Sequence, residues 1–148
     1  MLMNKKIIIG VIVVVLIGLA YYLLSPLIIV KELNEDLPPL DTGVREAVAQ
    51  GNFVASAHEV AGNVKIIREA GRGDYISFED FETVNGPDLF IYLATDTTAE
   101  DFVNLGEIKA TRGNVNYEIP AGTDLEKYDT VLVWCRAFSV LFSYAELE

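Results

Sequence analysis

The chain has 148 residues, 11 of them basic and 22 acidic, which gives a formal net charge of −11. Lys5 and Lys6 precede every acidic residue, so residues 31–148 hold nine basic and all 22 acidic side chains and carry 9 − 22 = −13. Such a surface repels nucleic acid phosphates and no basic patch offsets it, which excludes nucleic acid as a partner.

The first predicted element is a membrane helix. Residues 7–30 contain 24 consecutive residues without a charge, and roughly 20 apolar helical residues cross the hydrocarbon core of a bilayer. We therefore expect residues 1–30 to be a single transmembrane anchor that contacts the lipid bilayer through residues 7–30, and we expect Pro26 to end its helix.

The flanking charges predict how this anchor is oriented. Lys5 and Lys6 should stay in the cytoplasm, which makes the chain a single-pass protein of the cytoplasmic membrane with an extracytoplasmic C-terminal domain. A signal peptide cleaved after Gly18-Leu19-Ala20 is the alternative, and it places the domain in the same compartment.

Residues 31–49 are acidic and contain Pro38-Pro39. This composition predicts a stiff, solvated spacer that lifts the following domain off the membrane. The segment VREAVAQ, residues 44–50, is predicted to form a short helix capped by Asp41 or Thr42.

Residues 50–148 are predicted to form an all-β domain. Residues 114–119 alternate cleanly, with apolar side chains at Val115, Tyr117 and Ile119. Similar runs occur at residues 52–58, 63–69, 74–79, 89–94, 103–109, 130–135 and 139–146. Short strands at this spacing, separated by glycine-rich turns, are typical of an antiparallel β-sandwich or barrel, here of about eight strands.

The residue inventory excludes several kinds of chemistry. With one histidine, His58, and one cysteine, Cys135, the chain cannot build blue-copper or histidine-rich zinc sites, and it has no dithiol motif. The carboxylates of Glu79, Asp80 and Glu82 fit a polar strand face, a calcium site or a paired-carboxylate acid/base site, although no EF-hand spacing supports calcium. The residues favour an electron-transfer or binding module over a turnover enzyme.

Cys135 has three interpretations from the residues alone. Val131 and Val133 share its face of the strand, and Leu132 and Trp134 lie on the other, so the strand should be central and covered on both sides. Cys135 is then a buried small hydrophobe, a redox-active thiol or a thiolate ligand to a prosthetic group. His58 follows a strand whose alternation places it at the rim or outer face, as a surface residue or a ligand.

The same residues resemble the DM-thirteen domain, a module found beside DOMON domains and proposed to act in electron transfer. The resemblance covers residues 50–148 and lies in GNF (51–53), DYISFEDF (74–81), GPDLFIYL (86–93), LGEIK (105–109), GNVNYEIP (113–120) and YDTVLVWCRAFSVLFSYAEL (128–147). It implies a β-sandwich whose signature cysteine is Cys135, acting as a free thiol or as a ligand to a group such as non-covalent haem.

The resemblance leads to one functional hypothesis, and the residues support another. In the first, Cys135 is a redox centre with a partner protein or a membrane cytochrome, His58 is a candidate second ligand, and Trp134, Phe138 and Phe142 line the approach to the sulfur. In the second, the sandwich is a non-catalytic extracellular binding or adhesion module that works through its loops, and Cys135 is structural.

Overall fold

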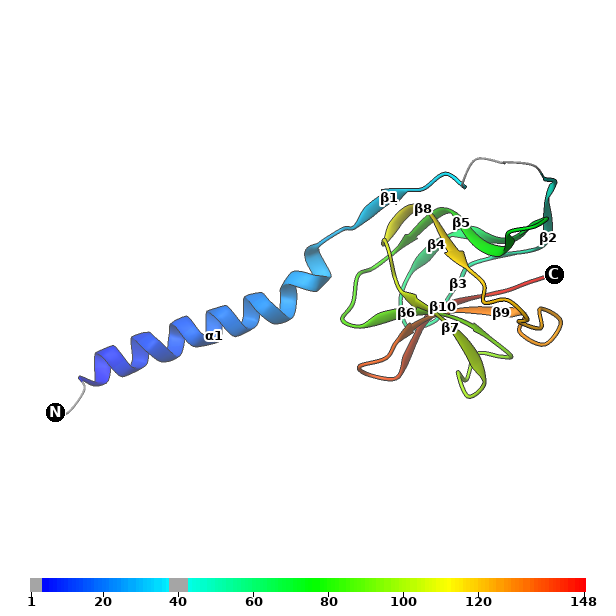
Figure 1. Cartoon of the computed structure of the whole chain (residues 1–148). Helices are drawn as coiled ribbons and strands as arrows, with labels where there is room; N and C mark the ends of the chain where they lie inside the picture. The colour runs from blue at the N-terminus through cyan, green and yellow to red at the C-terminus, as the bar shows by residue number, and fades with distance from the viewer. Residues whose placement is uncertain (1–3, 38–42) are drawn as a thin grey trace.

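The computed structural model describes residues 4–37 and 43–148, with the side chains of residues 25–28 left aside. One helix, α1 (Lys5–Ile28), precedes ten strands in two five-stranded sheets (Figure 1). The first sheet has the order β1 (Glu32–Asn34), β8 (Arg112–Glu118), β5 (Gly73–Thr83), β4 (Val60–Glu69) and β2 (Arg45–Asn52). The second has the order β3 (Val54–Ala55), β10 (Val140–Glu146), β9 (Thr130–Cys135), β6 (Leu89–Ala94) and β7 (Phe102–Glu107). The predicted β-sandwich is therefore confirmed.

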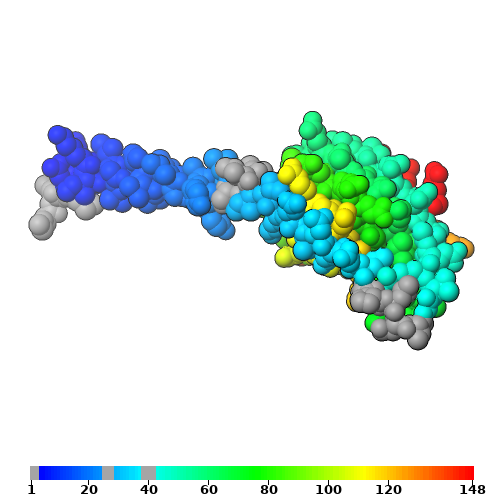
Figure 2. Space-filling view, turned by 90° about the horizontal axis from the view of Figure 1, so that it is seen from above, coloured from blue at the N-terminus to red at the C-terminus, as the bar shows by residue number. Residues whose placement is uncertain are grey.

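Helix α1 is apolar and long enough to cross a membrane, and none of the window Lys5–Leu24 is buried against the rest of the chain. It projects from the sandwich as a separate rod (Figures 1 and 2). The prediction that α1 ends at Pro26 was wrong, because the helix continues to Ile28. Proline removes one backbone N–H donor, and here the helix continues for two residues beyond it despite that loss.

Strand β1 joins the sandwich to the helix almost directly. The Lys31 carbonyl accepts hydrogen bonds from the backbone N–H groups of Thr111 and Arg112, at 2.8 and 3.1 Å. From there Glu32–Asn34 pair in parallel with β8, and in Figure 2 this segment lies against the body of the domain. The acidic segment containing Pro38-Pro39 was predicted to separate the anchor from the domain. Residues 32–34 of that predicted spacer instead form β1, and Pro38-Pro39 lie outside the described residues.

The predicted helix through residues 44–50 was wrong, because these residues belong largely to strand β2. Its register pairs Ala47 with Ile67 and Ala49 with Ile66 of β4. Local helix propensity is a weak preference, and pairing with a sheet edge outweighs it here. The proposed capping residues Asp41 and Thr42 lie outside the described residues.

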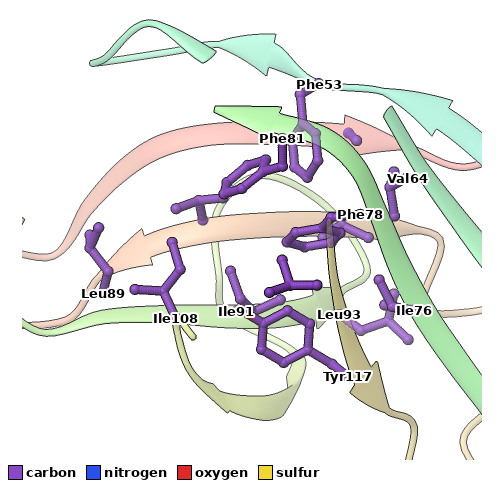
Figure 3. Packing of buried hydrophobic residues seen from close by; sticks show 14 of the residues in the cluster. Phe53, Val64, Ile76, Phe78, Phe81, Leu89, Ile91, Leu93, Ile108 and Tyr117 are labelled. Atoms are coloured by element: carbon purple, nitrogen blue, oxygen red, sulfur yellow. The ribbon is translucent and has the colours of Figure 1, made fainter. Parts of the chain in front are cut away.

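The core fills the space between the two sheets (Figure 3). Phe53, Phe78 and Phe81 form an aromatic group with ring centroids 4.9–5.0 Å apart. Burial of each such side chain stabilises the fold by about 1.5–3 kcal/mol. The fully buried aliphatic residues around them come from both sheets and include Val64, Ile66, Ile76, Ile91, Leu93, Val115, Val131 and Val133.

Strand β9 is the middle strand of its sheet, as predicted, and it is apolar on both faces. Val131, Val133 and Cys135 belong to the main core. Leu132 and Trp134 belong to an outer cluster with residues that include Phe90, Tyr92 and Tyr144. Tyr92 stacks there on Phe102 at 4.0 Å. The side chains on this outer face cover one another, which explains how β9 can be apolar on both faces without a third layer of secondary structure.

The sandwich has two distinct ends. At the end where the helix joins, called the anchor end, the Asn85 Nδ2 group donates a hydrogen bond to the Ile29 carbonyl at 3.1 Å. Figure 1 shows the β5–β6 and β9–β10 loops at this end and the C-terminus on the opposite side. At that far end, Tyr128 donates a hydrogen bond to Asp101 at 2.8 Å, which joins loops 95–101 and 121–129.

Candidate functional site

Cys135 is the last residue of β9 and lies at the anchor end. It is flanked by Leu89 of β6 and Val140 of β10 and is 1% exposed. Its Sγ–H group donates a hydrogen bond to the Pro87 carbonyl at 3.1 Å. The thiol is therefore covered by the loop of residues 85–88, which we call the cover loop.

A charged pair fixes one end of the cover loop. Arg136 donates two hydrogen bonds to the Asp88 carboxylate, each 3.0 Å long, and its backbone N–H donates to the Asp88 carbonyl at 3.0 Å. Asp88 has φ 59°, in the left-handed region that aspartate tolerates better than most residues. The guanidinium also lies over the Phe90 ring, 4.1 Å from its centroid. Arg136, the residue after Cys135, therefore ties the end of β9 to the cover loop.

The other end of the cover loop is tied to the anchor. The Asn85 side chain donates to the Ile29 carbonyl, and its Oδ1 atom accepts the N–H of Gly86 at 3.0 Å. Ile29 directly follows α1. The cover loop therefore connects the thiol side of the sandwich with the first residue beyond the helix.

The structure brings His58 and Phe142 together at this end. Their ring centroids are 4.0 Å apart, and the backbone N–H of His58 donates a hydrogen bond to the Phe142 carbonyl at 3.2 Å. Phe142 is buried in the core cluster that contains Cys135. It also contacts Gly86, where an added Cβ would lie 2.8 Å from the ring. Gly86 is required because the cover loop passes directly over Phe142.

Two of the predicted lining residues lie elsewhere. Trp134 precedes Cys135 in β9 and points to the opposite face of the sheet, because successive side chains of a strand alternate. Phe138 is 70% exposed in the β9–β10 loop. Of the three aromatic residues, Phe142 alone packs in the same cluster as Cys135.

The arrangement around the sulfur does not fit a haem ligand. A haem-ligating thiolate needs open space beside Sγ for the macrocycle, whereas this sulfur is hydrogen-bonded to the cover loop and packed in the core. Four open hollows of about 400–650 Å³ lie on the described surface, and neither Cys135 nor His58 lines any of these four.

The acidic cluster of residues 79–82 serves the sheet. Glu79 forms an ion pair with Lys65 at 2.7 Å, and Glu82 pairs with Arg112. Asp80 lies at a β-bulge and its N–H is bound by Asn114 at 2.9 Å. Among the described residues, no group of three or more potential metal ligands gathers.

Sequence reasoning missed Asn85, Asp88 and Arg136 as parts of the site. A signal was present, since Asp88 belongs to the run GPDL and Arg136 directly follows Cys135. What joins them is the register of β6 and β9, which pairs Leu89 with Cys135. That register connects residues 46 positions apart, and no local pattern reveals it.

Comparison with models of protein families matches residues 52–147 to the family described as Electron transfer DM13. The match covers 96 of the 148 residues, from the end of β2 to the residue after β10. Searches of curated proteins and of solved structures give no match.

Proposed function

The chain belongs to the electron-transfer DM13 family, and from this premise we propose that it is a membrane-anchored, extracytoplasmic redox domain whose reactive group is the Cys135 thiol. The family supports a redox-related role, and the apolar helix α1 supports attachment to a membrane. The assignment to Cys135 rests on the geometry of the cover loop.

One observation carries the assignment: the loop that covers the thiol is the loop that is tied to the anchor. Pro87 accepts the Sγ–H hydrogen bond, and Asn85 of the same loop binds Ile29. A cysteine kept solely for packing requires no such connection. Such a connection allows the accessibility of a thiol that reacts near the membrane to depend on contacts at the anchor end.

The chemistry available to a single thiol is exchange with an external disulfide. The Cys135 thiolate attacks one sulfur of a partner disulfide, a new S–S bond forms, and the other partner sulfur leaves as a thiolate. The proton lost from Cys135 passes to solvent or to the leaving thiolate. Because the chain has one cysteine, a second thiol must come from outside to resolve the mixed disulfide. The partner is therefore a dithiol–disulfide protein, or a small-molecule disulfide together with its thiol, outside the cytoplasm.

Reaction requires the cover loop to move, since Cys135 is buried. The Arg136–Asp88 pair is partly exposed, with side-chain accessibilities of 55% and 31%, and such pairs contribute about 0–1 kcal/mol. Local openings cost less free energy than global unfolding when few buried contacts hold the segment. The cover loop meets this condition better than the strands on either side.

The proposal is tested with oxidised glutathione and the full chain in phosphatidylcholine vesicles. Mass spectrometry after acid quenching measures the fraction of chains that carry one glutathione. We expect the folded wild-type chain to be modified at Cys135 and to be restored by reduced glutathione. The Cys135→Ala chain is the matched control and should gain no mass.

The opposite result is equally informative. A thiol that is modified solely after denaturation is a core residue, and the redox proposal then fails. That outcome favours the alternative, a non-catalytic binding or adhesion module in which the buried Cys135 is structural.

A further inference from the structure

The anchor end of the sandwich presents apolar side chains beside the membrane helix. We propose that this end docks on the bilayer that holds α1, with Phe138 of the β9–β10 loop inserted into the lipid interface. The inference rests on the proposed function in one respect, namely that α1 spans the membrane.

A short connection joins the helix to the first sheet. Helix α1 has 24 residues and is therefore about 36 Å long, whereas the hydrocarbon core is about 30 Å thick. Two residues, Ile29 and Val30, separate its end from Lys31, whose carbonyl is bound by the first sheet. The sandwich therefore begins at the membrane surface, with no spacer to hold it away.

Exposed apolar residues gather at the anchor end. Phe138 is 70% exposed, and Ile29, Val30 and Val84 are also exposed. Val84 adjoins Asn85, which binds Ile29, so these residues share the anchor end. Figure 1 shows the β5–β6 and β9–β10 loops on the side of the sandwich that the helix enters. Aromatic rings are favoured at the membrane interface, where an apolar face can be buried about 5–10 Å.

The β9–β10 loop is held in a defined conformation. Residues 136–139 form a tight turn in which Ser139 has φ 52°. Arg136 holds the base of this turn to Asp88 through two hydrogen bonds. The turn therefore projects Phe138 from a fixed base, which lowers the conformational entropy lost on insertion.

Charge distribution favours the same orientation. Loops 95–101 and 121–129 at the far end contain six carboxylates and one lysine. At the anchor end the cations Arg112 and Arg136 are paired with Glu82 and Asp88, so these charges cancel. The strongly acidic end therefore points away from lipid headgroups. In this orientation the cover loop faces the membrane, so a partner reaches Cys135 at the interface.

The test uses full-length chains in phosphatidylcholine vesicles that contain a lipid with a nitroxide near the top of its acyl chain. In a Cys135→Ala background, Ala137→Cys receives an environment-sensitive fluorophore next to an intact Phe138. Ala121→Cys carries the same label in an exposed far-end turn, and Val14→Cys reports whether the helix has inserted. Circular dichroism establishes that each labelled chain is folded.

We expect strong quenching at position 137, none at position 121, and a loss of the quenching at 137 when Phe138→Ser is added. If the helix label is shielded from aqueous iodide but position 137 is not quenched by the lipid, docking is wrong and the anchor stands. If the helix label is open to iodide, the anchor fails and docking fails with it.

A second measurement avoids labels and the loss of the cysteine. Hydrogen exchange of the amides of residues 136–139 is compared in vesicles between the wild-type chain and the Phe138→Ser chain. Slower exchange in the wild type supports docking, and equal exchange in both contradicts it.

Discussion

Asp88 holds in place the loop that covers the Cys135 thiol. Its carboxylate pairs with Arg136, and the residue beside it, Pro87, accepts the thiol hydrogen bond of Cys135. The ion pair lies at the surface and adds little to global stability. Its importance is local, because it holds the cover loop over the sulfur.

The Asp88→Asn substitution should therefore expose Cys135 without unfolding the chain. Asparagine tolerates φ 59° but loses the charged pair. Alkylation of Cys135 by iodoacetamide should be up to about fivefold faster, the factor that corresponds to about 1 kcal/mol.

Asp74→Asn is the matched control. It removes a similar two-bond pair with Arg68, also at 3.0 Å, which lies away from the cover loop. Both variants should unfold at nearly the wild-type urea concentration. Equal alkylation rates in the two variants would remove the role assigned to Asp88.

Tyr117 makes stability depend on alkaline pH. Burial raises the pKa of Tyr117 to about 12, and its hydroxyl oxygen accepts the Lys109 N–H at 3.0 Å. The unfolded tyrosine ionises near pH 10, so between pH 10 and 12 the folded state holds a proton that the unfolded state has lost. Stability is therefore fully present below pH 10 and falls as the pH rises toward 12.

Urea unfolding between pH 9 and 11 measures this effect. The free energy of unfolding should fall with a slope that approaches about 1.4 kcal/mol per pH unit above pH 10. Tyr117→Phe should remove that part of the slope. An unchanged slope would mean that Tyr117 ionises as freely in the folded chain as in the unfolded one.

At the scale of elements, β1 depends on a glycine of its partner strand. Gly113 of β8 has φ 113°, and a Cβ added there would lie 2.0 Å from the Leu33 carbonyl oxygen. The two strands approach so closely that no side chain fits. Gly113 therefore permits the parallel pairing that connects the sandwich to the anchor.

Gly113→Ala should detach β1 from the sheet. Native-state hydrogen exchange should become faster at Thr111 and Arg112, whose N–H groups donate to Lys31, and at Glu35, whose N–H donates to Asn114. Gly122→Ala is the control, since Gly122 has φ 84° but open space around it. Gly122→Ala should lower the free energy of unfolding by about 1–2 kcal/mol through backbone strain. The amides of Thr111, Arg112 and Glu35 should stay protected in this variant. Protection of the same amides in Gly113→Ala would show that the strands can separate slightly without loss of pairing.

Strand β2 is held at the other edge of the same sheet by a buried carboxylate. Glu69 is 4% exposed, and Arg45 binds its Oε2 atom through Nε and a terminal nitrogen at 3.1 and 2.9 Å. Arg72 lies 3.7 Å from the other oxygen. A buried carboxylate requires such partners, which gives a reason for residues 45–52 to be a strand rather than a free helix.

At the scale of the whole molecule, the anchor and the sandwich are continuous. No flexible segment separates α1 from β1, and the cover loop binds the residue after the helix. The domain therefore has a preferred orientation toward whatever surface holds the helix. A reactive thiol at the anchor end would meet partners at that surface.

This continuity predicts where the chain can be shortened. A chain that begins at Lys31 should fold, because it keeps β1. A chain that begins at Gly43 should lose at least about 2 kcal/mol of unfolding free energy, because the backbone hydrogen bonds of β1 are lost at about 0.5–1.5 kcal/mol each.

Urea unfolding and light scattering of the two chains test this. The chain that begins at Gly43 should also self-associate, because it exposes the edge of β8. Equal unfolding free energies and equal scattering would show that β1 is dispensable to the sandwich.

The sequence by itself determined the features that depend on local pattern. An uncharged run of 24 residues shows a helix that is long and apolar enough to cross a membrane. Alternation showed most strands from β4 to β10 within a few residues, and the apolar run of residues 131–135 showed a central strand with two apolar faces. Each is a property of consecutive residues, because side-chain periodicity follows backbone geometry.

The tertiary structure alone decided which distant residues meet. The pairing of β6 with β9 joined Asp88 to Arg136 and placed Pro87 over Cys135, and the position of β10 brought Phe142 to His58. Sheet edges turned residues 32–34 and 45–52 into strands against their local composition. Strand register is set by packing between segments far apart in the chain, so the short-range pattern of one sequence contains too little information to fix it.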